Sequence, residues 1–182
     1  MQYTSKHINR TEIDYQQSIK KQRLEFKKIG SNTIVNYALC LLIIIITVYS
    51  IFQYEIGNQT YSSALGVYLF VIIWLSVNLS LNNALIKIHG KNVAENKTDI
   101  IKTLDALYIS HNLIINKNRI MTSFEFYAPV WNREITLLFD ENIMYLNITT
   151  IGRTHSPTWI HGLYNFIKAK RIARYYKSHF NN

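Results

Sequence analysis

The 182-residue sequence has almost no cysteine, the residue that forms disulfides and many metal sites. Its single cysteine, Cys40, excludes an intramolecular disulfide and a metal site built on cysteines. The six glycines stand apart from one another, so no phosphate-binding glycine loop is present. There is neither a G-x-S-x-G nucleophile motif nor a histidine pair with a third ligand at metal spacing. These absences predict a protein that is not an enzyme and holds neither a cofactor nor a metal ion.

Charge is also missing from two long stretches. Residues 29–54 contain no ionisable acid or base, residues 56–86 contain none either, and only Glu55 stands between them. Each stretch reaches the roughly 20 apolar residues that a helix needs to cross the ~30 Å hydrocarbon layer. They predict a membrane protein with a transmembrane helical hairpin over residues 34–86 and an outer loop at residues 54–63.

Basic residues flank this hairpin on one side only. Residues 1–33 carry seven Lys/Arg and three Asp/Glu, residues 54–63 carry only Glu55, and residues 87–182 carry thirteen Lys/Arg and seven Asp/Glu, so +4, −1 and +6 give the formal charge of +9. Lys and Arg near membrane spans stay on the cytoplasmic side. The pattern predicts a multi-pass protein of a cell inner membrane with both termini cytoplasmic: a basic N-terminal arm over residues 1–33 and a cytoplasmic domain over residues 87–182. Topology then explains the positive charge without nucleic acid.

Three asparagines stand out inside the apolar stretches. Asn36 lies near the cytoplasmic end of the first, while Asn78 and Asn82 lie one helical turn apart towards the cytoplasmic end of the second. Amides at such a depth bind one another across helices, with about 0.6–2 kcal/mol for each hydrogen bond. They are candidates for transmembrane association: as a staple within the hairpin, as contacts in a homo-oligomer, or as the lining of a polar path.

Residues 87–182 have the pattern of a small α+β domain. Four alternating segments are joined by connections too short for parallel pairing, and they predict an antiparallel β-meander. Before them, helical spacing behind Thr98 and Asp99 predicts a helix. After them, Ser156 as a cap and Pro157 at the first helical position predict a long C-terminal helix.

The polar loop before this last helix is the candidate site for a ligand or partner. Arg153, His155 and Ser156 precede a helix N-terminus, where backbone N–H groups attract anions. Trp159 offers a stacking surface, and His161 is close by in the sequence. These residues suit a phosphate or a nucleotide-like signal. The alternative is an ordinary strand-to-helix loop with a good cap.

The order of basic arm, two apolar spans with a tiny outer loop, and β-rich domain resembles the two-transmembrane effectors of bacterial antiphage defence. Retron transmembrane effectors and the two-span, β-rich effectors of cyclic-oligonucleotide systems share this architecture, which covers the whole chain. The resemblance implies a toxin of abortive infection: the cytoplasmic domain senses infection, and the spans then assemble in the lipid bilayer and disrupt the inner membrane. It also implies a controlling partner, either a retron reverse transcriptase with its nucleic acid or a nucleotide signal. The strands are few for a full β-barrel sensor, which favours the retron-like version.

A second interpretation comes from another class of protein. A meander followed by one long helix also fits a pleckstrin-like domain, so the chain is alternatively a non-enzymatic membrane scaffold that binds protein or lipid. An enzyme ranks third, because no catalytic constellation is visible.

Overall fold

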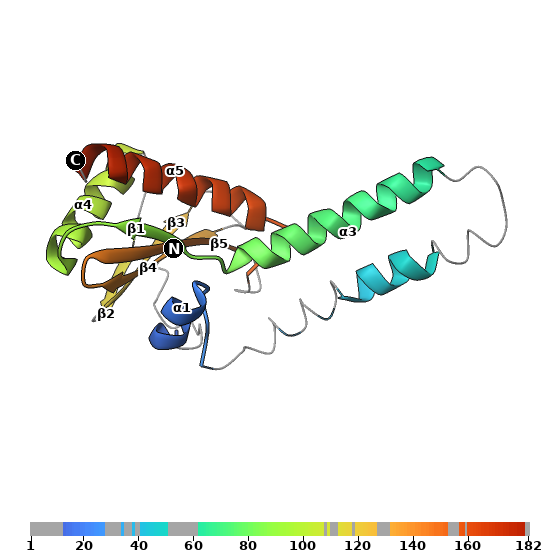
Figure 1. Cartoon of the computed structure of the whole chain (residues 1–182), viewed down its shortest axis with the longest axis horizontal. Coiled ribbons are helices and arrows are strands. Elements are labelled where there is room, and N and C mark those ends of the chain that lie inside the picture. Colours follow the sequence, from blue (N-terminus) through green and yellow to red (C-terminus); the bar gives the residue numbers. More distant parts are fainter. Residues whose placement is uncertain are drawn as a thin grey trace.

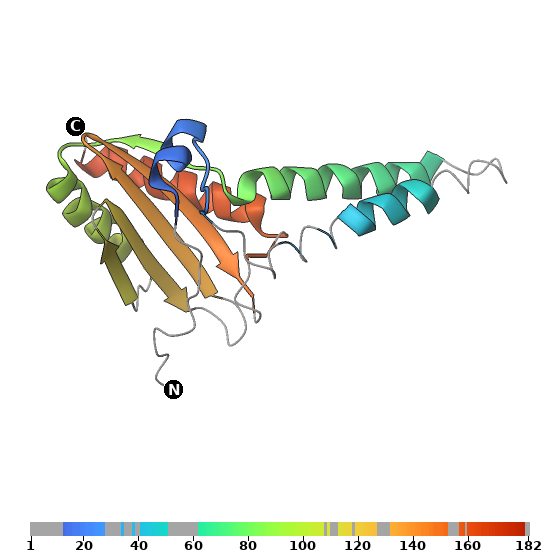
Figure 2. The same ribbon diagram turned by 90° about the horizontal axis from the view of Figure 1, so that it is seen from below.

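The protein consists of a layered sheet domain and a pair of helices that extends away from it (Figure 1). The computed structural model describes residues 13–27, 34, 38, 41–50, 62–107, 109, 113–117, 119–126, 132–152, 157–158 and 160–180. The helices α4 (Val93–Ala106) and α5 (Gly162–Phe180) cover one face of the sheet, and α1 (Tyr15–Lys21) lies on the other. From this body α3 (Ser62–Asn82) extends outward, and the helical residues 41–50 run alongside it (Figure 2).

The sheet is an antiparallel meander with one added edge strand. Its strands are β1 (Ile86–His89), β2 (Leu113–Lys117), β3 (Ile120–Phe126), β4 (Asn132–Asp140) and β5 (Ile143–Ile151), in the spatial order β1-β5-β4-β3-β2. The β4–β5 hairpin turns at Glu141, which adopts a left-handed φ of 48°. The meander β2 to β5 is present as expected, whereas β1 lies where the sequence predicted the boundary between a membrane span and the following domain.

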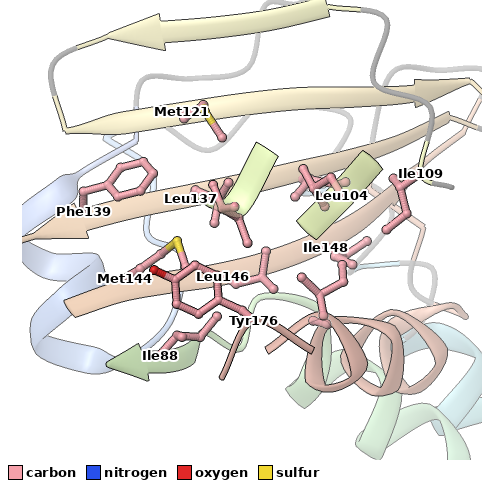
Figure 3. Packing of buried hydrophobic residues seen from close by; sticks show 14 residues of the cluster. Ile88, Leu104, Ile109, Met121, Leu137, Phe139, Met144, Leu146, Ile148 and Tyr176 are labelled. Carbon is pink, nitrogen blue, oxygen red and sulfur yellow. The ribbon is translucent and has the colours of Figure 1, made fainter. Parts of the chain in front are cut away.

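Alternation along the strands decides which side chains form the main core. On the face covered by α4 and α5, β4 contributes Ile135, Leu137 and Phe139, and β5 contributes Met144, Leu146 and Ile148. From α5, Tyr176 reaches into this core (Figure 3). Its hydroxyl donates to Asn96 Oδ1 of α4 at 2.8 Å, so the one polar atom of this buried ring is satisfied.

Alkaline unfolding should depend on Tyr176. Burial raises the pKa of its phenol to about 12, and the nearby carboxylates of Asp99 and Glu95 add to the increase. The unfolded chain loses this proton near pH 10 while the folded chain keeps it, so the stability present below pH 10 should fall as the pH rises from 10 towards 12. We expect the urea midpoint of wild type to fall more steeply over this range than that of Tyr176→Phe. Parallel curves would contradict the assignment.

A smaller cluster anchors the N-terminal segment to the opposite face of the sheet. Helix α1 begins after Asp14, whose carboxylate accepts a hydrogen bond from Gln17 N at 3.1 Å. Leu24, which follows the helix, is buried against Leu138 and Tyr145. Part of the basic N-terminal segment therefore packs on the sheet.

The apolar arm comprises residues 66–74 of α3 and residues 41–50, and most of its side chains are exposed. On α3, Val67 is 63 %, Phe70 65 % and Ile73 60 % exposed. The helical residues 41–50 expose Leu41, Leu42, Ile43, Ile45, Ile46, Val48 and Tyr49. The hydroxyls of Thr47 and Ser50 donate to carbonyls of their own helix, at 2.7 and 2.8 Å. The arm thus presents an uncharged, largely apolar surface, on which the hydroxyls of Thr47 and Ser50 are satisfied within their own helix.

The predicted transmembrane hairpin is wrong. Among the helices of the described ranges, none combines the length and the apolar character that crossing a membrane requires. Helix α3 has 21 residues, but Leu75, Asn78 and Asn82 are buried, and the amide of Asn78 binds α5 of the sheet domain. The preceding part of about 13 residues rises roughly 20 Å, less than the ~30 Å hydrocarbon layer. Two predictions that depended on this hairpin are therefore wrong as well: the membrane-protein fold class, and the multi-pass inner-membrane localisation with both termini cytoplasmic.

Two predicted helix starts are also corrected. Helix α4 begins six residues before Asp99, because Asn92 is its N-cap and accepts from Glu95 N at 2.9 Å. Helix α5 begins at Gly162 rather than at Pro157. Pro157 instead forms an isolated antiparallel bridge with Ile151, so the chain is still extended there.

Candidate functional site

The α3–α5 junction, formed by Asn78, Gly162 and Leu163, links the arm to the sheet domain. Asn78 is fully buried, and its Oδ1 accepts a hydrogen bond from Leu163 N at 3.0 Å. Its Nδ2 donates to Trp74 O at 2.9 Å, which fixes the amide on its own helix. Asn78 therefore does for α5 what an N-cap residue does, although it lies 85 residues earlier in the chain.

Close backbone approach is the second feature of the junction. A Cβ atom on Gly162 would lie 2.0 Å from the backbone oxygen of Asn78. Only a glycine fits at this position, because backbone atoms on the facing helix cannot turn aside as a flexible side chain can. The side-chain amide of Asn78 and the absence of a Cβ atom at Gly162 thus determine how closely α3 and α5 cross.

A further link joins the end of α3 to β5. The Asn147 Nδ2 donates to the backbone oxygens of Asn82 and Ala84, at 3.2 and 2.9 Å. Its Oδ1 accepts from Thr149 Oγ1 at 2.7 Å, so both ends of the buried Asn147 amide are satisfied. The chain segment between α3 and β1 is consequently held on β5, the strand next to the edge strand β1.

Beneath the first half of α5 lies a nearly buried ionic group, the Glu125 cluster, formed by Glu125, Arg133 and Lys168. Glu125 Oε2 accepts from Arg133 Nη1 at 3.2 Å and from Lys168 Nζ at 2.8 Å. The three residues come from β3, β4 and α5, so the cluster ties the helix to two strands. Arg133 also lies under the exposed ring of Tyr164, with its guanidinium carbon 5.2 Å from the ring centroid.

Neutral polar groups complete this end of α5. Asn165 and Thr150 bind each other through their side chains at 3.1 Å, and both are buried. His161 Nδ1 lies 2.8 Å from Thr158 Oγ1. Burial lowers the pKa of His161, and the positive charge of Arg133 lowers it further, so the imidazole is neutral at pH 7.

The structure describes only some of the candidate site residues that were predicted from the sequence. Arg153, His155, Ser156 and Trp159 lie outside the described residues, as does Asn36. His161 lies immediately before α5, near Arg133. Asn78 binds α5, and the backbone oxygen of Asn82 accepts from Asn147 of β5. Their role in association between helices stays a prediction.

The Glu125 cluster was missed from the sequence. Glu125 and Arg133 occupy strand positions that face the same side of the sheet as the core residues, and they are directly paired across β3 and β4. A charged residue at an inward strand position is the signal that could have found them, because such charges need a partner when buried. Lys168 carries no such signal, since it reads as one of several surface cations on a helix.

This arrangement suits binding and mechanical coupling. Within the described part of the chain, no group of three His, Cys, Asp or Glu side chains is placed to hold a metal ion. Comparison of the chain with protein-family models, with curated proteins and with solved structures finds no match.

Proposed function

We propose that this protein is a non-enzymatic effector of a bacterial antiphage defence system, in which the sheet domain holds the apolar arm in check. The observation that carries the proposal is the α3–α5 junction. An exposed apolar arm is costly in water, and here it is fixed at its base to a helix that itself rests on the sheet. A trigger acting on the sheet domain therefore has a direct route to the arm.

That route consists of contacts between packed elements. The Glu125 cluster and the Thr150–Asn165 pair fasten α5 to the sheet, and Asn78 fastens α3 to the first turn of α5. A shift of α5 would withdraw Leu163 N from the Asn78 amide and leave a buried acceptor unpaired, which costs about 1–3 kcal/mol. A binding event on the sheet domain is thus able to change how firmly the arm is held.

In this proposal the released arm self-associates and compromises the integrity of the inner membrane. The chain at rest needs neither a membrane-spanning state nor a membrane location. The controlling partner is either a retron reverse transcriptase with its nucleic acid, which occupies the sheet domain until infection changes it, or a nucleotide signal that binds this domain during infection.

Loosening the junction should release the effector without infection. We expect uninfected cells that carry the complete gene neighbourhood to keep their membrane potential and grow with the wild-type chain. With Asn78→Leu they should depolarise and stop growing, because Leu163 N loses its acceptor. A membrane-potential dye and growth curves are the readouts; immunoblotting confirms equal amounts of protein, and circular dichroism confirms that the purified variant is folded.

Ser80→Ala is the matched control, since Ser80 is exposed on the same helix and its hydroxyl donates only to Ser76 O. This variant should behave as wild type. If the wild-type chain leaves potential and growth normal both at high expression alone and during phage infection with its neighbours, the effector proposal fails. The scaffold interpretation would then be favoured.

A further inference from the structure

The outer face of α5 is divided into an apolar half and a cationic half. Residues 164, 167, 171 and 174 recur every three or four positions and lie opposite the buried side of the helix. Tyr164 and Ile167, each 55 % exposed, form the first half together with Ile160, which precedes the helix. Exposed cations form the second half: Lys170, Arg171, Arg174 and Lys177.

The cationic half lacks any counter-charge on its own helix. Helix α5 carries five Lys/Arg and no acidic residue. Only Lys168 turns inward, to Glu125. On the neighbouring α4, by contrast, Glu95 and Asp99 are paired with Lys91 and Lys102, each at 3.7 Å. Because the transmembrane topology that would explain the positive charge is wrong, this concentrated row of cations needs another reason.

Tyr164 gives the apolar half a ring held in place before any ligand arrives. Its ring rests on the Arg133 guanidinium, 5.2 Å from the centroid. Arg133 is in turn held by Glu125 at 3.2 Å, which also binds Lys168 one turn further along α5. An exposed aromatic ring fixed from below is a stacking platform whose ordering cost is already met in the unbound protein.

We infer that the outer face of α5 binds single-stranded nucleic acid. Such ligands are bound by a positive track for the phosphates combined with aromatic side chains on which bases stack. Here Lys170, Arg171, Arg174 and Lys177 contact the phosphates, and Tyr164 stacks on a base. An acidic protein would use the cations but not the ring. A duplex hides its bases, so Tyr164 would contribute little. The inference does not depend on the effector role.

The test measures binding of the full-length protein to a fluorescent oligo-deoxythymidine of about twelve nucleotides, by anisotropy at several salt concentrations. We expect the combined change Arg171→Gln, Arg174→Gln and Lys177→Gln to weaken binding more than about tenfold. The slope of log K against log salt should fall by about 0.7 for each phosphate that the variant no longer neutralises. Tyr164→Ala should weaken binding about tenfold, and Tyr164→Phe should restore it.

The matched control removes the same number of exposed charges elsewhere, by changing Lys20, Lys87 and Lys102 to Gln. It should bind as wild type. Equal weakening by both charge sets would show attraction to net charge alone and overturn the inference. Tight binding of duplex DNA that Tyr164→Ala leaves unchanged, or binding only to anionic vesicles or acidic protein, would overturn it as well.

Discussion

Replacing Gly162 with alanine is expected to lower the free energy of unfolding by about 1–3 kcal/mol, because the added methyl group overpacks a closed crossing. The new Cβ would lie 2.0 Å from the backbone oxygen of Asn78. Relief requires α3 and α5 to separate, and separation also lengthens the 3.0 Å hydrogen bond from Leu163 N to Asn78. Urea unfolding followed by circular dichroism measures the change.

Gly66→Ala provides the matched control on the other side of the junction. A Cβ at Gly66 would meet nothing within 4 Å, and the residue lies within α3. Alanine should therefore raise helix stability by about 0.5–1 kcal/mol. If the two glycine variants change the urea midpoint in the same direction, the close crossing of α3 and α5 is not as described.

Removing the charge of Glu125 should destabilise the protein by about 3 kcal/mol or more. Glu125→Gln leaves Arg133 and Lys168 without their shared carboxylate in a nearly buried place, where side-chain exposure is only 10–18 %. Loss of one partner from a buried ion pair typically costs about 3–5 kcal/mol, because the remaining charge is left uncompensated. Chemical denaturation of the purified variant gives the value.

Asp140→Asn is the same chemical change at an exposed pair. Asp140 lies 3.4 Å from Arg119, and both side chains are more than a third exposed. This variant should cost less than about 1 kcal/mol. Replacing Glu125, Arg133 and Lys168 together by leucine or methionine should recover much of the lost stability, since no charge then stays buried. Equal effects of the two single variants would place the Glu125 cluster in effectively solvated surroundings.

The meander was predictable because its signals are local. Alternating apolar residues and turn sequences lie within each β-hairpin, and β3, β4 and β5 appear where the alternation indicated. Helix starts were less predictable, because several candidate caps compete. Asn92 caps α4 instead of Thr98, which lies inside the helix and donates to Ala94 O.

The prediction of a transmembrane hairpin was wrong because it missed contacts between residues far apart in the sequence. Hydropathy records the composition of residues 56–86, but not that α5 binds Asn78 from a position 85 residues later. The site was hidden for the same reason. Glu125 and Lys168 are 43 residues apart, and no local pattern joins them. Polar residues inside an apolar stretch were informative, yet their partners lay in the sheet domain.

The long sequence separation across the α3–α5 junction also affects how the protein is made. At about 5–20 residues per second, the ribosome adds Leu163 to the chain some 4–17 s after Asn78. During that interval α3 exists without the helix that buries its base. The whole of α3, and not only the arm, is then exposed to water. The newly made chain should therefore depend on a chaperone more than its small size suggests.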